Sequence, residues 1–118
     1  MNIDHLATCL NAYRFRFVTE KDLQDGIEAM LTAEQIPFQR ERAISAPDRP
    51  DFLVDGNLAV EVKIKGSLAQ LLRQASRYAS HPEIAGIIVV GSPRWLATVP
   101  SALCDKPVKA VRLLGSLL

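Results

Sequence analysis

Two stretches of the chain repeat apolar side chains at the spacing of an amphipathic helix, in which residues three or four apart share a face. The first begins after Thr19, a capping residue with Asp22 three positions later, and its apolar face consists of Leu23, Ile27, Met30 and Leu31. The second begins at Gly66-Ser67 and ends near His81-Pro82, and its apolar face consists of Leu68, Leu71, Leu72, Ala75 and Ala79. The pattern therefore predicts helices over about residues 20–34 and 67–80.

A weaker pattern precedes these helices. Asn2 can cap a short helix whose apolar positions are Ile3, Leu6 and Leu10. The run YRFRFV that follows, residues 13–18, looks extended instead.

Beyond Pro37 the apolar positions follow the period of strands. Residues 38–44 alternate polar and apolar side chains only loosely. The turn sequence Asp55-Gly56-Asn57 separates two β-rich runs, residues 52–54 and 58–64. Asp-Gly favours a hairpin because glycine accepts the positive φ of a tight turn, so we expect two adjacent antiparallel strands here.

The rest of the chain adds two strands. Residues 85–90 form an unbroken apolar run before Gly91, which is typical of a strand buried on both faces. Residues 95–103 are predicted to be helical despite Pro100, and residues 108–114 are predicted to form the last strand. The resulting order is α-β-β-β-α-β-α-β. It predicts an α/β fold with a mixed sheet flanked by helices, in a single domain over residues 1–118.

The composition agrees with one globular domain, because 48% of the 118 residues are hydrophobic and 23% are charged. The longest apolar run, residues 84–90, is far shorter than the roughly 20 residues of a membrane-spanning helix, so we expect no membrane association. Cys9 and Cys104 lie outside any C-x-x-C spacing, which argues against a zinc site or a disulfide framework. Unpaired thiols favour a reducing, cytoplasmic location.

Positive charge is concentrated in the C-terminal half of the chain. The net charge of the whole sequence is only +1. Residues 61–118, however, carry eight Lys or Arg and three Asp or Glu, a local net charge of +5. Such a region can offer a face to phosphates despite the near-neutral total.

Three polar residues lie in otherwise apolar strands: Asp51 at the start of the first hairpin strand, and Glu61 and Lys63 in the second. Because side chains alternate along a strand, Glu61 and Lys63 share a face. Pairing about the turn places Asp51 opposite or diagonal to Glu61. Two carboxylates beside a lysine form a site of hard oxygen ligands for Mg²⁺, a chemistry that suits phosphodiester hydrolysis. Alternatively, Glu61 and Lys63 form a solvated ion pair on an exposed sheet face.

The string Arg49-Pro50-Asp51, followed by a turn and then Glu61-Val62-Lys63, resembles the PD-(D/E)XK nuclease superfamily, whose core has the same α-β-β-β-α-β order. The resemblance covers about residues 19–91. It implies a restriction-endonuclease-like αβββαβ core with an additional C-terminal strand. It also implies that Asp51 and Glu61 bind the divalent metal and that Lys63 assists the nucleophile.

Two features of the helices extend the resemblance. Glu20 lies on the sheet-facing arc of the first helix, and it resembles the early glutamate that completes the site in Holliday-junction resolvase-like and VRR-NUC-like nucleases. Glu28 is the other candidate for that position, and Glu20 can also simply favour the helix N-terminus electrostatically. In the second helix, Gln74 and Tyr78 resemble the Q-x-x-x-Y motif of the branch that includes lambda exonuclease. Their i, i+4 spacing puts both on one face, where packing at the edge of the core is the alternative role.

Six basic residues are predicted to contact phosphates rather than bases, because nothing resembles a major-groove recognition helix. They are Arg40, Arg42, Arg49, Lys65, Arg73 and Arg77. Each is also compatible with a solvated surface charge.

Other chemistries have less support. His5 and His81 are too few and too isolated for a ββα-metal nuclease site. No Ser/His/Asp or Cys/His spacing indicates acyl transfer, and no Gly-rich loop leads from a strand into a helix to hold a nucleotide.

The sequence therefore predicts a Mg²⁺-dependent deoxyribonuclease, with Mn²⁺ as a substitute metal, in which Asp51, Glu61 and Glu20 bind the metal. The absence of a recognition domain favours structure-dependent cutting of DNA. A non-catalytic DNA-binding or scaffold module of the same fold, or a nuclease subunit of a larger phage or repair assembly, are the alternatives.

A homodimer is also expected, because the C-terminal segment is unusually apolar for a terminal edge strand. Its apolar residues are Val108, Ala110, Val111, Leu113, Leu114, Leu117 and Leu118. The alternative is that this strand completes the core of a monomer.

Overall fold

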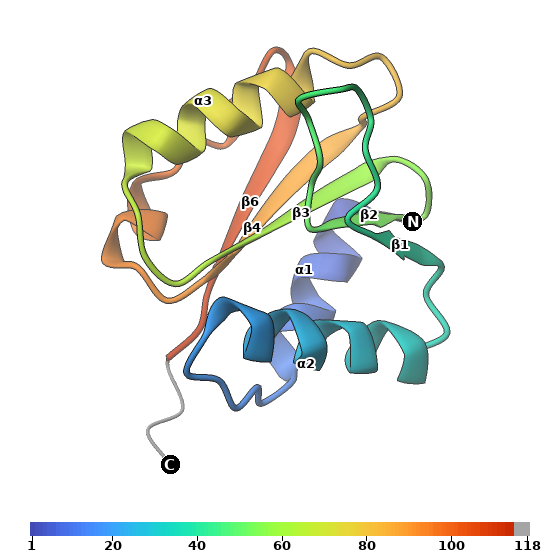
Figure 1. Cartoon of the computed structure of the whole chain (residues 1–118), viewed down its shortest axis with the longest axis vertical. Coiled ribbons are helices and arrows are strands. Elements are labelled where there is room, and N and C mark those ends of the chain that lie inside the picture. Colours follow the sequence, from blue (N-terminus) through green and yellow to red (C-terminus); the bar gives the residue numbers. More distant parts are fainter. Residues whose placement is uncertain (115–118) are drawn as a thin grey trace.

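Six strands form one mixed sheet in the computed structural model of the chain, which describes residues 1–114 (Figure 1). In chain order they are β1 (Phe38–Arg40), β2 (Phe52–Val54), β3 (Leu58–Lys63), β4 (Gly86–Gly91), β5 (Ala102–Leu103) and β6 (Lys106–Arg112). Their order across the sheet is β1-β2-β3-β4-β6-β5. β3, β4 and β6 run parallel, and the remaining pairs are antiparallel.

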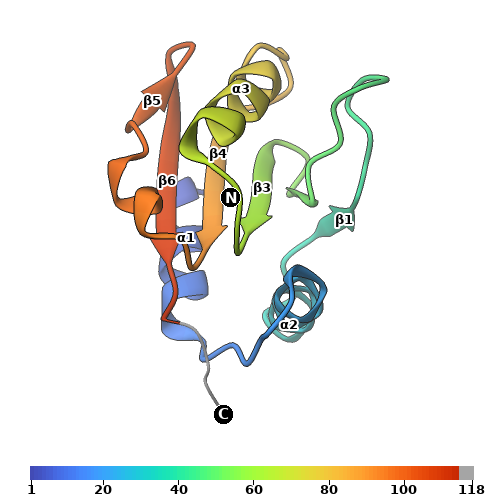
Figure 2. The ribbon, with the colours of Figure 1, turned by 60° about the vertical axis from the view of Figure 1, so that its left-hand side comes forward.

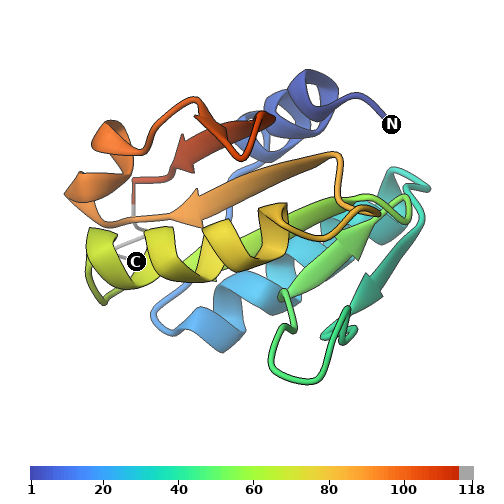
Figure 3. The ribbon, with the colours of Figure 1, turned by 90° about the horizontal axis from the view of Figure 1, so that it is seen from above.

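Helices cover both faces of this sheet (Figure 3). α1 (Ile3–Ala12) and α2 (Glu20–Ala33) pack on one face, and α3 (Leu68–Ala79) and the short 3-10 helix η1 (Arg94–Thr98) pack on the other. The predicted α/β class, a mixed sheet flanked by helices, is thus confirmed. None of the helices within residues 1–114 is long and apolar enough to cross a membrane.

The two amphipathic helices begin where their capping residues predict. Thr19 caps α2 and Ser67 caps α3, each by accepting a hydrogen bond from the backbone amide three residues later. The α2 side chains predicted to face the core are all buried: Leu23, Ile27, Met30 and Leu31. Since α2 begins at Glu20 and α3 begins shortly after Lys63, both helices start beside the same end of β3.

The predicted hairpin is present between β2 and β3. Asp55 and Gly56 have φ values of 52° and 77°, the positive angles of a type I′ turn. The resulting register pairs Phe52 with Val60. The residue before Phe52 therefore lies opposite the residue after Val60, which places Asp51 next to Glu61.

Two predicted elements are shorter in the structure. The strand expected over residues 38–44 ends at Arg40, because Glu41 adopts φ of 53° and turns the chain away from β2. The helix expected over residues 95–103 is only the 3-10 helix η1, followed by β5. β5 and β6 are joined by a second tight turn at Cys104 and Asp105, which both have positive φ.

The C-terminal strand lies inside the sheet, between β4 and the short β5. Its range is Lys106–Arg112 rather than the predicted 108–114. Val108, Val111 and Leu113 are buried in the protein's own cores, so part of the apolar character of this segment belongs to the monomer. Leu117 and Leu118 lie outside the described residues, and the homodimer stays a prediction.

A close backbone approach fixes the end of β3. Gly91, the last residue of β4, pairs with Lys63. A Cβ atom at Gly91 would lie only 1.6 Å from the carbonyl oxygen of Lys63, so any other residue would push the two strands apart. The absence of a side chain at Gly91 therefore sets the backbone position of Lys63.

Gly91→Ala should destabilise the protein by about 1–3 kcal/mol, because the added methyl group overlaps a backbone atom that cannot rotate away. Urea unfolding measures this change. Ser92→Ala, at the adjacent position, adds no Cβ and should stay within about 0.5 kcal/mol of the unmodified protein. Equal stability of the two variants would show that the strands separate at Lys63 without cost.

Candidate active site

The edge of β3 is open beyond Phe52, the first residue of β2. β2 pairs with β3 only as far as Val60, whereas β3 continues to Lys63 with β4 on its other side. The Val62 amide donates instead to Asp51 Oδ2 at 2.7 Å, and the Ile64 amide donates to Glu20 Oε1 at 3.3 Å. Two carboxylates, one from the start of β2 and one from the start of α2, therefore line up along the same edge.

Glu61 lies between these carboxylates and α3. It is only 4% exposed. Its Oε2 lies 3.4 Å from Lys63 Nζ, and its Oε1 lies 3.0 Å from the Tyr78 hydroxyl. That hydroxyl is also 3.2 Å from the carbonyl oxygen of Arg49, so it can donate its proton to either acceptor. The contacts hold Glu61 with one oxygen against α3 and the other against the lysine.

Burial and mutual repulsion shift the pKa values of these acids. Burial, followed by the charge of Asp51, holds the pKa of Glu61 well above its usual range. Burial also raises the pKa of Asp51, although the Val62 amide opposes that shift. The pKa of Tyr78 is raised too, first by burial and then by the charge of Glu61. Negative charge in this cluster is therefore only partly compensated by Lys63, and a cation would relieve it.

A second layer of contacts orients Asp51. Gln24, one turn after Glu20 on α2, donates from Nε2 to Asp51 Oδ1 at 3.2 Å. The Oε1 of Gln24 accepts a hydrogen bond from Arg40 at 3.2 Å. Both oxygens of Asp51 thus have donors, one from the β3 backbone and one from α2.

The loop between β1 and β2 is tied to α3 through Asp48. This carboxylate is 4% exposed, and its two oxygens lie 2.9 Å from Arg77 Nε and 2.9 Å from His81 Nε2. Ser45 donates to it from within the loop at 3.2 Å. Asp51 follows Asp48 by three residues. These contacts therefore hold in place the segment that contains Asp51.

Most of the predicted site residues come together at the end of β3. Five of them contact β3 or one another there: Glu20, Asp51, Glu61, Lys63 and Tyr78. Gln74 lies one turn before Tyr78 on α3 and is half-buried. Glu28, the alternative to Glu20, instead pairs with Arg40 at 3.4 Å.

The predicted phosphate-contacting residues divide into two groups. Three are held by other side chains. Arg40 pairs with Asp25 at 2.8 Å and lies over the Phe52 ring, Arg77 pairs with Asp48, and Arg42 donates to Gln39. The other three are exposed and have no ion pair within residues 1–114: Arg49, Lys65 and Arg73.

Sequence reasoning missed two residues of this site. Gln24 carries a detectable signal, because it follows Glu20 by four positions and so lies on the same side of α2. Asp48 carries none, since its partners Arg77 and His81 come from 29 and 33 residues away and from a different element.

The donor set suits a hard cation. Within residues 1–114, no group of three or more His, Cys, Asp and Glu side chains is placed to hold a metal ion. Two adjacent carboxylates, Asp51 and Glu61, are nevertheless the kind of ligand that Mg²⁺ uses, and Mg²⁺ commonly takes its other ligands from water and substrate phosphate. The residues present therefore fit Mg²⁺ or Mn²⁺ with a partly open coordination shell.

Comparisons with protein-family models, with curated proteins and with solved structures find no match to this chain. The chemistry of the site therefore rests on its own geometry.

Asp48→Asn should destabilise the protein by about 2–4 kcal/mol at neutral pH, because a buried carboxylate that holds His81 and Arg77 would be replaced by a neutral amide. Urea unfolding at a pH of about 7 measures this loss, and far-ultraviolet circular dichroism checks that the variant folds.

The stability that Asp48 contributes depends on pH. The His81 and Arg77 contacts hold the pKa of Asp48 below the value of 3.8 expected in the unfolded chain. The stability it contributes is therefore fully present above that value and is lost as the pH falls through the lower folded-state pKa. The difference between the unmodified protein and Asp48→Asn should shrink as the pH falls below about 4. A difference that stays constant to about pH 2 would contradict this role.

Proposed function

We propose that the protein is a Mg²⁺-dependent nuclease that hydrolyses phosphodiester bonds in DNA. One observation carries the proposal: the carboxylates of Asp51 and Glu61 lie beside Lys63 at the end of β3, in the arrangement that the resemblance to PD-(D/E)XK nucleases implies. The order α2-β1-β2-β3-α3-β4 around this point supports it, because it matches the core order of that superfamily.

The chain's own residues have distinct roles in this proposal. Asp51 and Glu61 hold the metal, and Glu20 supplies a further carboxylate along the same strand edge. A bound Mg²⁺ would neutralise phosphate charge and lower the pKa of a water molecule. Lys63 lies at the solvent-accessible side of the cluster, 24% exposed, where its ammonium group can orient the attacking water.

Two hydrogen-bonded supports keep this geometry in place before substrate binds. Tyr78 holds Glu61 from α3, and Gln24 holds Asp51 from α2. Ligands whose positions are fixed in advance need little reorganisation during the reaction. Replacement of either support would therefore weaken metal binding and turnover without removing a ligand.

The same features support a choice of substrate and of cellular location. Three exposed basic residues are available for phosphates, Arg49, Lys65 and Arg73, and no helix within residues 1–114 resembles a major-groove reader. We therefore propose cutting that depends on DNA structure rather than on base sequence, in the cytoplasm, where DNA is accessible and thiols such as Cys104 stay reduced.

Lys63→Ala should lower the rate of cleavage by at least about a hundredfold, because it removes the group that orients water and stabilises charge in the transition state. The assay is cleavage of labelled junction, flap, duplex and single-stranded DNA with Mg²⁺, with Mn²⁺ and with a chelator. Lys109→Ala, which removes an exposed lysine paired with Asp4 on α1, is the matched control and should cleave normally.

Because Lys63 is the partner of a buried acid, thermal unfolding of Lys63→Ala must accompany the assay. A folded Lys63→Ala that cleaves at the unmodified rate would contradict the role of the lysine. No metal-dependent cleavage of any substrate by the unmodified protein would contradict the nuclease.

Asp51→Asn and Glu61→Gln should each weaken Mn²⁺ binding by at least about tenfold, because a neutral amide is a poorer ligand for a hard cation than a carboxylate. Isothermal titration calorimetry measures the affinity. Asp4→Asn, at an exposed carboxylate on α1, controls for the loss of one negative charge. Unchanged affinity in both site variants would rule out this metal site.

A further inference from the structure

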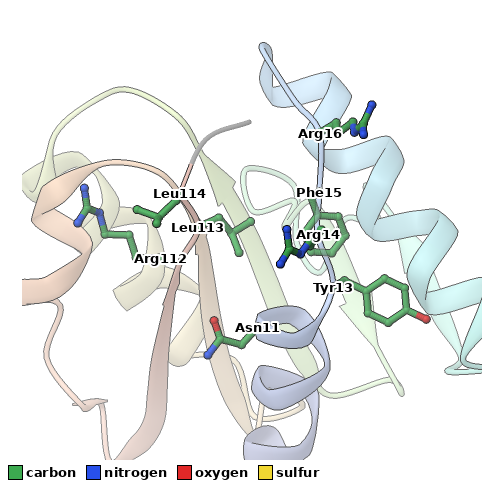
Figure 4. Close-up of a pocket in the computed structure, with 8 residues that line it drawn as sticks. All are labelled: Asn11, Tyr13, Arg14, Phe15, Arg16, Arg112, Leu113 and Leu114. Carbon is green, nitrogen blue, oxygen red and sulfur yellow. The ribbon is translucent and has the colours of Figure 1, made fainter. Parts of the chain in front are cut away.

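A pocket of about 650 Å³ lies at the end of the sheet and has no part in the site described above (Figure 4). One wall is formed by Asn11 and the extended run after α1, residues 13–16. The other wall is formed by Arg112, Leu113 and Leu114, at the end of β6. The run YRFRFV thus has a place in the fold: it leads from α1 past this pocket to Glu20.

The pocket is strongly basic. Arg14, Arg16 and Arg112 line it, and no acidic residue does. Figure 4 shows Arg14 directed across the pocket, whereas Arg16 and Arg112 extend outward from its two rims. Within residues 1–114, none of these three arginines forms an ion pair. Arg112 donates from Nε to the carbonyl oxygen of Ser92 at 3.3 Å, which holds the guanidinium near the strand end. Since a guanidinium has five N–H donors, the others remain for an anionic ligand.

Strand register places this pocket near the candidate active site. Lys63 pairs with Gly91, and Gly91 pairs with Arg112. The three residues therefore lie in one line across the parallel strands, and two strand spacings put Arg112 about 10 Å from Lys63. Figure 2 shows the arrowheads of β3, β4 and β6 at the same end of the sheet, the end where the chain passes from α1 to α2.

The other side chains of the pocket suit a nucleotide. Leu113 and Leu114 form an apolar wall beside the arginines, and Leu114 is 85% exposed. An extended polynucleotide presents charged phosphates together with the less polar faces of sugars and bases. Its phosphates can therefore contact the arginines while its sugars and bases pack against the leucines. A free inorganic anion would use the arginines alone.

We propose that the pocket binds the phosphodiester backbone of the strand being cut, a few nucleotides from the scissile bond. The inference rests on the proposed function. The strand crosses the ends of β6, β4 and β3, with its phosphates held by Arg14, Arg16 and Arg112 and the bond to be cut beside Lys63. The basic pocket and the acidic site act in series on one strand, since the pocket attracts phosphates that the unliganded carboxylates repel.

Strand binding without cleavage tests the pocket separately from catalysis. The probe is a fluorescein-labelled oligo-dT of about 15 nucleotides, followed by anisotropy in a chelator over a series of salt concentrations. The variant is Arg14→Gln/Arg112→Gln, and Lys21→Gln/Lys109→Gln is the control with the same change in net charge. Both control lysines are exposed and paired with acids elsewhere. Arg14→Gln/Arg16→Gln is a second variant that leaves β6 intact.

Both arginine variants should bind at least about tenfold more weakly, and the dependence of log affinity on log salt should fall by about 1.4, or 0.7 for each lost phosphate contact. The lysine control should stay within about twofold of the unmodified protein. A folded arginine variant that binds like the control overturns the proposal. So does displacement of the DNA by poly-glutamate at the same concentration of charge, because the pocket would then bind acidic polypeptides equally well.

The possible outcomes separate failure of the proposed strand-binding pocket from failure of the proposed nuclease activity. If the unmodified protein binds the strand through these arginines but never cleaves DNA, the nuclease fails and the pocket stands. If it cleaves DNA, and the arginine variants leave KM unchanged, the pocket fails and the nuclease stands. Duplex DNA and oligo-U of the same length, run in parallel, establish whether the strand is bound single or paired and whether ribose is accepted.

Discussion

The unpaired edge of β3 is the constraint on which the site depends. β2 begins at Phe52 and pairs with β3 only as far as Val60, while β4 continues to pair with β3 as far as Lys63. The amides of Val62 and Ile64 would lack partners at this edge, and unpaired buried amides are costly. Asp51 and Glu20 accept them. The hydrogen bonds that complete the sheet therefore also gather two carboxylates next to a third, Glu61, and their shared negative charge makes the place suitable for a cation.

The surrounding structure holds these acids from both faces of the sheet. Gln24 on α2 and Tyr78 on α3 each hydrogen-bond one of them, and Asp48 ties the loop before Asp51 to α3. Gly91 lets β4 approach closely enough to fix Lys63. Raised carboxyl pKa values and a close-packed strand end are costly for the fold, and such costs are commonly concentrated at functional sites.

The sequence predicts the parts of the fold that depend on local chemistry. Thr19, Ser67 and the Asp-Gly turn mark their elements because caps and tight turns need particular side chains, and the hairpin then places Asp51 opposite Glu61. β5 escapes detection, because its turn uses Cys104 and Asp105 rather than glycine. The pairing of Asp48 with Arg77 and that of Arg40 with Asp25 depend on tertiary contacts, which no local pattern encodes. The basic pocket, too, joins two segments almost a hundred residues apart.

The most direct test of the central claim is the position of a bound metal. Crystals grown with Mn²⁺ and measured at a wavelength where manganese scatters anomalously would locate the ion without reference to any activity. The account predicts an anomalous peak about 2 Å from carboxylate oxygens of both Asp51 and Glu61, beside the end of β3. Crystals at saturating Mn²⁺ with no peak between these two carboxylates, or with a peak only elsewhere, would contradict it.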